Sequence, residues 1–271
     1  MTDDLLWRHL RDLPAFRALL RAVEARFYAD LPLREPVLDL GCGDGHFGAV
    51  GLPRPPQVGL DPWAASLREA RRRGAYRLLV QADGGRMPFP DGCFATVVSN
   101  SVLEHIPDLE PVLAEVARVL SEPAPDGAGG GAFYFCVPGP RFSPSLSVGR
   151  AFDRLGLRAL GDAYRAFFDR VARHCHYHAP EAWQALLERA GLRRVRWWSY
   201  FSPRALAALE WGHYLGLPSL VARRLTGRWV LWPSRANLWL TERLLRPFYE
   251  QPRSNEDTCL FFVAEKGNGR A

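Results

Sequence analysis

A short apolar run that ends in a cluster of glycines, at residues 36–45, constrains the fold of this chain most strongly. The run reads Pro-Val-Leu-Asp-Leu, and Gly-Cys-Gly-Asp-Gly follows at once. An apolar run of this length is typical of a strand that is buried on both faces, as in a parallel sheet. Glycines directly after it let the backbone turn tightly and approach a ligand closely. The segment therefore predicts a ligand-binding loop at the carboxyl end of a buried strand.

Further short apolar runs alternate with stretches of helical periodicity. Strands are expected at 58–61, 76–80, 94–99 and 132–137, around 195–197, and at 258–265. Helices are expected at 4–29 with a break at Pro14, and at 63–73, 108–120 and 180–190. This alternation predicts βαβ units and a parallel sheet. Right-handed crossovers bring the carboxyl ends of the strands to one edge, where open α/β sheets bind ligands.

Two classes of ligand compete for the glycine loop. A dinucleotide requires G-x-G-x-x-G and places its pyrophosphate at a helix N-terminus. Here His46 occupies the position of the third glycine, and Asp39 before the loop would repel a pyrophosphate. A cationic or zwitterionic ligand without phosphate fits an acidic loop better.

Residues 37–45, V-L-D-L-G-C-G-D-G, resemble the first motif of the class I S-adenosylmethionine (SAM)-dependent methyltransferases. Residues 87–91 resemble the L-P-F-x-D segment of that family, and residues 99–106 resemble the segment that follows its fourth strand. The resemblance covers roughly 34–139, 178–200 and the last strand. Two departures concern a short helix after the glycine loop and a longer turn at 121–131 before the fifth strand.

The resemblance implies an α/β fold: a Rossmann-like, doubly wound, seven-stranded and mostly parallel sheet with helical insertions and an N-terminal helical segment. The expected organisation has N-terminal helices at 1–33 and a SAM-binding core at 34–202. A substrate-side insertion lies within that core at 139–178. A Trp/Arg-rich helical insertion or lid at 203–252 precedes the final core strand and tail at 253–271.

The same resemblance implies which residues bind SAM: Asp39, Gly41, Gly43, Asp61, Asp83, Gly84 and Asn100. In the family pattern, Asp61 accepts hydrogen bonds from both ribose hydroxyls and Asp83 contacts the adenine amino group. Asn100 faces the methionine end. Structural alternatives remain open, because Asp39 could hold the loop, Asp61 could cap the next helix and Asp83 could be a turn residue.

His105 is the candidate for direct chemistry. It follows the fourth strand, on the side of SAM that faces the acceptor in the family pattern. A neutral imidazole there could accept a proton from a hydroxyl or an acidic carbon of the acceptor. The alternative is a histidine that only positions the loop.

A second histidine-rich segment, His-Cys-His-Tyr-His, occupies residues 174–178. Its histidines alternate at period two and would share one face of an extended segment, as metal ligands do. No carboxylate lies within the segment, so no metal site is expected. We expect His176, Tyr177 and His178 to line the acceptor side of the site, with a structural loop as the alternative.

The insertion at 203–252 combines four tryptophans and seven arginines with three glutamates. This composition fits four roles: a lid packed onto the sheet, an apolar acceptor cavity, a dimer interface, or contact with a membrane surface through Trp and Arg. The last of these makes peripheral membrane contact a candidate interaction.

The net charge of +6 comes almost entirely from arginine, since Lys266 is the only lysine. An arginine excess fits an anionic partner, yet no basic run exceeds Arg71–Arg73. The amino-methylation motifs of nucleic-acid enzymes (Asn-Pro-Pro-Tyr, Asp-Pro-Pro-Tyr) and a Pro-Cys nucleophile are missing. These observations favour a small-molecule acceptor over nucleic acid.

Five scattered cysteines and an N-terminus without a signal-peptide core favour a reducing, cytoplasmic location. The expected function is SAM-dependent methyl transfer, by in-line displacement, to a small, apolar or lipid-like acceptor. An RNA or other nucleic-acid methyltransferase and a catalytically inactive partner protein with the same fold are the alternatives.

Overall fold

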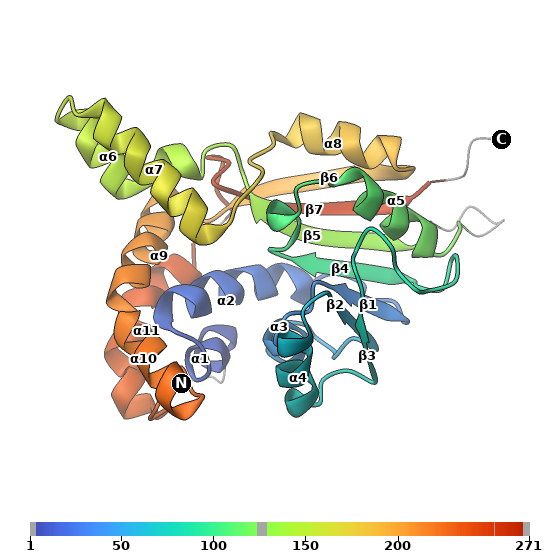
Figure 1. Cartoon of the computed structure of the whole chain (residues 1–271), viewed down its shortest axis with the longest axis horizontal. Helices are drawn as coiled ribbons and strands as arrows, with labels where there is room; N and C mark the ends of the chain where they lie inside the picture. Colours follow the sequence, from blue (N-terminus) through green and yellow to red (C-terminus); the bar gives the residue numbers. More distant parts are fainter. Residues whose placement is uncertain (1–3, 124–128, 252, 268–271) are drawn as a thin grey trace.

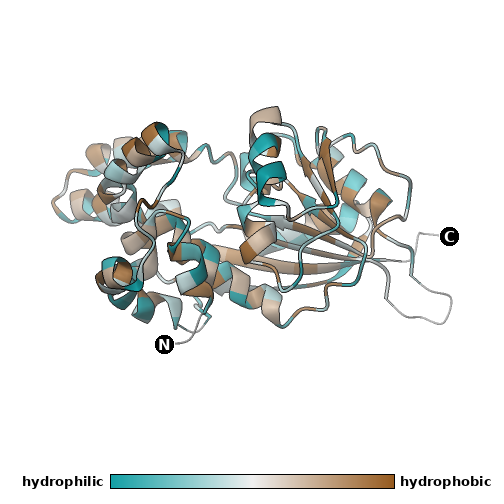
Figure 2. Cartoon of the chain, turned by 90° about the horizontal axis from the view of Figure 1, so that it is seen from below, coloured by the Kyte–Doolittle hydropathy of each residue, from teal (hydrophilic) through white to brown (hydrophobic). Residues whose placement is uncertain are grey.

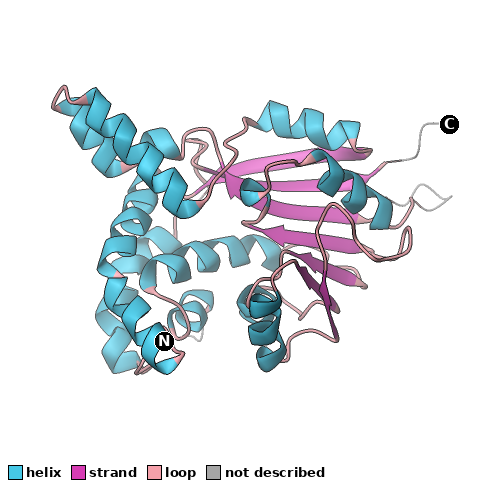
Figure 3. Ribbon diagram, viewed as in Figure 1, coloured by secondary structure: helices cyan, strands magenta, loops and turns pink. Residues whose placement is uncertain are grey.

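The computed structural model describes residues 4–123, 129–251 and 253–267. Its strands are β1 (Val37–Leu40), β2 (Val58–Asp61), β3 (Leu78–Gln81), β4 (Thr96–Asn100), β5 (Ala132–Pro138), β6 (Leu192–Tyr200) and β7 (Cys259–Lys266). They form one sheet in the order β3-β2-β1-β4-β5-β7-β6. Strand β7 runs antiparallel to both of its neighbours, β5 and β6, and the other neighbouring pairs are parallel. The expected seven-stranded, mostly parallel sheet is confirmed (Figure 3).

Helices precede and connect these strands (Figure 1). They are α1 (Leu5–Leu10), α2 (Ala15–Ala29), α3 (His46–Val50), α4 (Ala64–Arg73), η1 (Leu103–His105), α5 (Glu110–Val119), η2 (Ser143–Ser145), α6 (Ser147–Arg154), α7 (Arg158–Ala172), α8 (Pro180–Arg189), α9 (Pro203–Leu215), α10 (Leu217–Thr226) and α11 (Arg235–Tyr249). The break at Pro14 and the short helix after the glycine loop are both present.

Two hydrophobic cores lie on opposite faces of the sheet, because successive strand residues point to opposite sides. In β5, Phe133 and Phe135 pack with α5 and α8, whereas Tyr134 and Cys136 pack with α1, α2 and α9. Strands β1, β4 and β5 are buried on both faces, which explains why their sequences read as continuous apolar runs.

Helices α6, α7, α9, α10 and α11 form a helical lobe beside the carboxyl ends of the parallel strands (Figure 1). These helices come from the two expected insertions. Helix α2 runs between this lobe and the sheet and contacts both α9 and α11. The N-terminal segment is therefore part of the structure around the strand ends, where a ligand site is expected.

Candidate functional site

A cavity of about 630 Å³ opens at the carboxyl ends of β1, β2 and β4. Such a volume lies within the range of about 300–1,000 Å³ that small-molecule sites occupy. The structure brings all seven sequence-predicted SAM-binding residues into its wall: Asp39, Gly41, Gly43, Asp61, Asp83, Gly84 and Asn100. Residues from four separate loops meet there because the parallel strands all end at one edge.

The glycine loop is shaped by backbone conformations that favour glycine. Gly41 has φ +76°, and a Cβ atom there would lie 2.4 Å from Cγ1 of Val102. Gly43 has φ +56°, and a Cβ atom there would meet nothing within 4 Å. Gly41 thus allows close packing against the loop after β4, and Gly43 keeps the cavity side of its own loop open.

Asp39 lies at the floor of this cavity and is almost fully buried, with 3% of its surface exposed. The hydroxyl of Tyr76 donates a hydrogen bond of 2.6 Å to its Oδ2 atom. Burial raises the pKa of Asp39 to about 6, while the Tyr76 hydrogen bond and Arg21 oppose this rise. A carboxylate held this way gains from a cationic ligand, because a nearby positive charge favours its ionised form.

Asp61 already holds two backbone groups of the site. Its Oδ2 accepts from the Gly43 amide and its Oδ1 from the Trp63 amide, both at 2.9 Å. Each carboxylate oxygen has a second lone pair, so Asp61 can also accept hydrogen bonds from the two hydroxyls of a ribose. Burial raises the pKa of Asp61 above its ordinary value. Asp83 similarly accepts the Gly85 amide at 2.7 Å and remains exposed.

Asn100 lines the cavity, but its side-chain amide is already used inside the protein. Its Nδ2 donates to Glu24 at 2.6 Å, and its Oδ1 accepts from the Cys136 thiol at 3.0 Å. Its backbone carbonyl accepts from Arg21. Arg21 itself lines the cavity, so this guanidinium from α2 faces the place expected for the methionine end.

Sequence reasoning missed the contribution of α2. Arg17 and Arg21 line the cavity, and Glu24 accepts hydrogen bonds from Arg21, Asn100, Ser101 and Tyr200. A signal was present, because residues 17, 21 and 24 are spaced i, i+4, i+7 and share one face of the helix. That polar stripe on a largely buried helix indicates a site facing it.

A second, smaller cavity of about 190 Å³ adjoins the first, with Arg17, Arg21, Ser101 and His105 in both walls. Most of its remaining wall is apolar: Phe16, Leu20, Val137, Pro138, Phe142, Phe168, Ala172 and Leu209. Polar groups gather at one end, where Glu104, His105 and His174 meet. We refer to the two spaces as the large and the small cavity.

His105 stands at the junction of the two cavities. Its Nδ1 lies 3.0 Å from the Arg173 carbonyl oxygen, which can only accept, so Nδ1 carries the proton and Nε2 presents a lone pair. Burial lowers the pKa of His105, so the ring is neutral near pH 7. Neighbouring Glu104 is buried, and burial raises the pKa of its carboxyl group to about 8.

The residues expected on the acceptor side lie elsewhere. His176 bonds to the Ile106 carbonyl and stacks on His178, which packs edge-on against Trp183. Tyr177 donates to Asp169 and stacks on Phe142. None of the expected three lines either cavity; their neighbour His174 does.

The residues around the large cavity fit SAM. Asp39 and Asp61 provide negative charge for a sulfonium ligand and acceptors for ribose hydroxyls. Arg21 and Arg17 stand where a ligand carboxylate could pair. Trp63, 69% exposed, lines the same cavity and is therefore not a core aromatic.

Comparison with known proteins agrees with this geometry. A family model described as "Methyltransferase domain" matches residues 38–124. A demethylmenaquinone methyltransferase of Thermus thermophilus is 31% identical over 169 residues, which cover 57% of this chain and 73% of that protein. The chain belongs to the class I SAM-dependent methyltransferases. SAM is the cofactor of this family, and its fold is the one described above.

A second relative matches this methyltransferase over a shorter stretch. A malonyl-[acyl-carrier protein] O-methyltransferase of Legionella pneumophila is 38% identical over 91 residues, which span 31% of this chain and 32% of that protein. Among solved structures, a SAM-dependent methyltransferase of Thermotoga maritima has a TM-score of 0.54 at 16% identity, covering 96% of this chain and 91% of its own. The similarity to the Thermotoga maritima structure shows a shared fold and nothing more.

Proposed function

We propose that this protein transfers a methyl group from SAM to a small, largely apolar acceptor held in the small cavity. The observation that carries the proposal is the shared wall of the two cavities. His105 and Ser101 border both spaces, so an acceptor in the small cavity would face the methionine end of a ligand in the large one. The names of the relatives, which refer to a quinone precursor and to an acyl group, support a small acceptor.

Bound SAM supplies an electrophilic methyl group on a sulfonium sulfur. The chain's own residues align the two reactants. Asp39, Asp61 and Arg21 hold SAM, and the apolar wall of the small cavity holds the acceptor. Such alignment lowers a barrier by about 7–11 kcal/mol when the reacting atoms are well oriented. The lone pair of His105 Nε2 is available to take a proton from the acceptor, which would add roughly 10²–10⁴-fold.

We further propose that the helical lobe rests on an anionic membrane surface and admits a lipid-like acceptor there. Helix α10 has no buried residue. Its leucines 217, 220 and 225 are 59%, 37% and 80% exposed, beside arginines 223 and 224. Further exposed apolar side chains belong to α9, α11 and the segment before α11: Trp211, Leu215, Leu231, Trp232, Trp239, Leu240 and Leu244. The ribbon coloured by hydropathy shows hydrophobic and hydrophilic residues in the helices of the lobe (Figure 2).

Charge supports an anionic surface as the occupant. Two of the three glutamates at 203–252, Glu210 and Glu242, are buried. The exposed charge of this part of the lobe is therefore dominated by arginine, which attracts anionic lipid. In the described residues no helix is long and apolar enough to cross a bilayer.

Two experiments test the methyltransferase proposal. In thermal unfolding, SAM or its demethylated product at 100 times the dissociation constant should stabilise the protein by about 2.7 kcal/mol, and NAD should not. A shift with NAD alone would overturn the SAM assignment. Incubation of a cell extract with the protein and methyl-labelled SAM, followed by mass spectrometry, then identifies the acceptor. Labelled nucleic acid rather than a small molecule would contradict the proposed acceptor class.

A further inference from the structure

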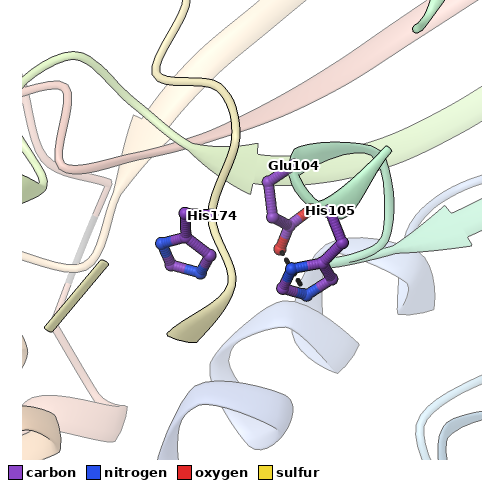
Figure 4. Close-up of side chains that lie close together, drawn as sticks. All are labelled: Glu104, His105 and His174. Carbon is purple, nitrogen blue, oxygen red and sulfur yellow. Dashed lines mark ion pairs between the residues drawn. The ribbon is translucent and has the colours of Figure 1, made fainter. Parts of the chain in front are cut away.

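We propose that Glu104, His105 and His174 form a binding site for a divalent transition-metal ion of the Zn²⁺ class in the wall of the small cavity. One ligand atom of each residue lies within 4.8 Å of the other two. Glu104 and His105 belong to η1, whereas His174 follows α7, so the tertiary fold brings them together (Figure 4). A carboxylate with two imidazoles is a common ligand set of catalytic zinc sites.

Hydrogen bonds orient both imidazoles as metal ligands. His105 donates its Nδ1–H to the Arg173 carbonyl at 3.0 Å, and this leaves Nε2 with its lone pair facing Glu104. Tyr177 gives its only hydroxyl proton to Asp169, so the Tyr177 oxygen must accept from Nδ1 of His174 at 2.9 Å. Nε2 of His174 is therefore also a lone-pair donor. Metal-bound histidines show this pattern, in which the second ring nitrogen bonds to a carbonyl or to a carboxylate-linked group.

The carboxylate of Glu104 supplies an independent observation. The residue is 2% exposed, and its Oε2 has no hydrogen-bond partner among the described residues. A buried carboxylate oxygen without a partner is costly, and such groups are paired or coordinate metals. Its Oε1 lies 3.9 Å from Nε2 of His105. The lone pairs of the two imidazoles and the carboxyl group of Glu104 thus face one another.

The donor set selects the class of ion. Two imidazole nitrogens with one carboxylate suit Zn²⁺ and its first-row neighbours better than Mg²⁺ or Ca²⁺, which prefer oxygen ligands. Tetrahedral zinc places its ligand atoms about 3.4 Å apart, so small side-chain rotations would close the site. Three protein ligands leave a fourth position open, as in catalytic rather than structural zinc sites.

The open position has a consequence for the acceptor, and this step rests on the proposed function. All three ligands line the small cavity, and His105 also borders the large cavity. An oxygen atom of the acceptor bound to the ion would therefore lie beside the methionine end of the SAM site. We infer that the acceptor carries a hydroxyl or enol oxygen, which the ion orients for methylation.

Metal binding is tested on purified full-length protein that has been dialysed against a chelator. Zn²⁺ titrated into the protein by calorimetry should bind at one equivalent per chain, and Co²⁺ should give the visible absorption of a low-coordinate site. Glu104→Gln and His174→Ala should each weaken the binding at least tenfold. His178→Ala is the matched control, because His178 lies in the same histidine-rich segment but outside both cavities, and it should bind as the parent does.

The outcomes separate the two proposals. SAM affinity measured on the metal-free protein reports on the large cavity alone and should be equal in the parent and in His174→Ala. Loss of Zn²⁺ binding in both site variants, with SAM binding retained, supports the metal site. The metal site is overturned if Zn²⁺ does not bind at one equivalent, or if Glu104→Gln and His174→Ala bind it as tightly as the parent. It is also overturned if His178→Ala weakens Zn²⁺ binding as much as they do. These results count against the site whether or not SAM binds.

Discussion

The hydroxyl of Tyr76 donates a 2.6 Å hydrogen bond to Oδ2 of Asp39, and this bond joins the segment before β3 to the end of β1. Burial raises the pKa of Asp39 to about 6, and the Tyr76 bond and Arg21 limit that rise while Asp61 adds to it. The ionisation of Asp39 thus depends on three neighbours, two of which, Arg21 and Asp61, also line the large cavity.

SAM affinity should therefore rise with pH between 5 and 7, as Asp39 loses its proton and gains a negative charge. With a pKa of about 6, the affinity at pH 5 should be about tenfold below its plateau, since one pH unit below the pKa leaves about a tenth of the group ionised. Calorimetric titrations across this range measure it. Tyr76→Phe should move the midpoint upward, and Asp39→Asn should bind weakly with no such midpoint. A parent protein with constant affinity contradicts the prediction.

The same carboxyl group should cost stability when no ligand is bound. Its folded pKa lies above its ordinary value, so protonation favours folding. The stabilising contribution is complete below about pH 4 and declines as the pH rises through about 6. At pH 8, ligand-free Asp39→Asn should unfold at a higher urea concentration than the parent, and at pH 4 this gain should vanish. A variant less stable than the parent at pH 8 would show that the ionised Asp39 is fully compensated.

Asp61→Asn should weaken SAM binding tenfold to a hundredfold. Hydrogen bonds to a charged group contribute about 1.5–3 kcal/mol, and the neutral amide also holds the Gly43 and Trp63 amides less tightly. Isothermal titration measures the loss. Asp91→Asn is the control, because Asp91 is 81% exposed and pairs with Arg118 instead. Similar affinities for the two variants would remove Asp61 from the binding site.

Replacing Leu220 and Leu225 of α10 by Asp should abolish binding to vesicles that contain anionic lipid. Neither residue is buried, so the fold should persist, and circular dichroism checks this. Co-sedimentation with vesicles of anionic and of neutral lipid measures the effect. Leu78→Asp, at a 51% exposed leucine of β3 away from the lobe, should bind as the parent does. If the double variant still sediments with anionic vesicles, the membrane proposal is wrong. If the two substitutions instead dissociate a dimer, this surface binds a second copy of the chain rather than a membrane.

His105→Gln should lower the turnover number at least tenfold while leaving SAM affinity unchanged. His105 lies at the junction of the cavities, and the lone pair of its Nε2 is needed for either of its alternative roles, proton acceptor or metal ligand. Initial rates with the acceptor found by labelling, beside calorimetry with SAM, measure both quantities. A smaller fall in turnover would assign His105 to loop positioning alone.

Much of the fold follows from local sequence. The breaks at Pro14 and after the glycine loop, all seven strands and the helical nature of 203–249 were predicted, with boundaries displaced by a few residues. Strands buried on both faces and helices with one apolar face leave periodic patterns that a linear reading detects. The sequence also predicts that the three aspartates at strand ends share one cavity, because parallel strands must end at one edge and the spacing of 22 residues repeats along the chain. All three line the large cavity, and their role in binding SAM stays a prediction.

Local sequence did not determine which side chains line the acceptor side of the site. The histidine-rich segment was expected to present His176, Tyr177 and His178, but the backbone directs His174 into the small cavity instead. Its partners, Glu104 and His105, lie about 70 residues away in the chain. Arg17 and Arg21 likewise reach the cavities from the far N-terminus.

The sequence alone thus determined the sheet, the glycine loop and the acidic residues that line the large cavity, because these depend on regular periods and on the common edge of parallel strands. Only the tertiary structure decided which side chains of α2, η1 and the segment after α7 meet. Their contacts depend on how the helices pack against the sheet, and helix packing depends on the shapes of side chains that are distant in the chain.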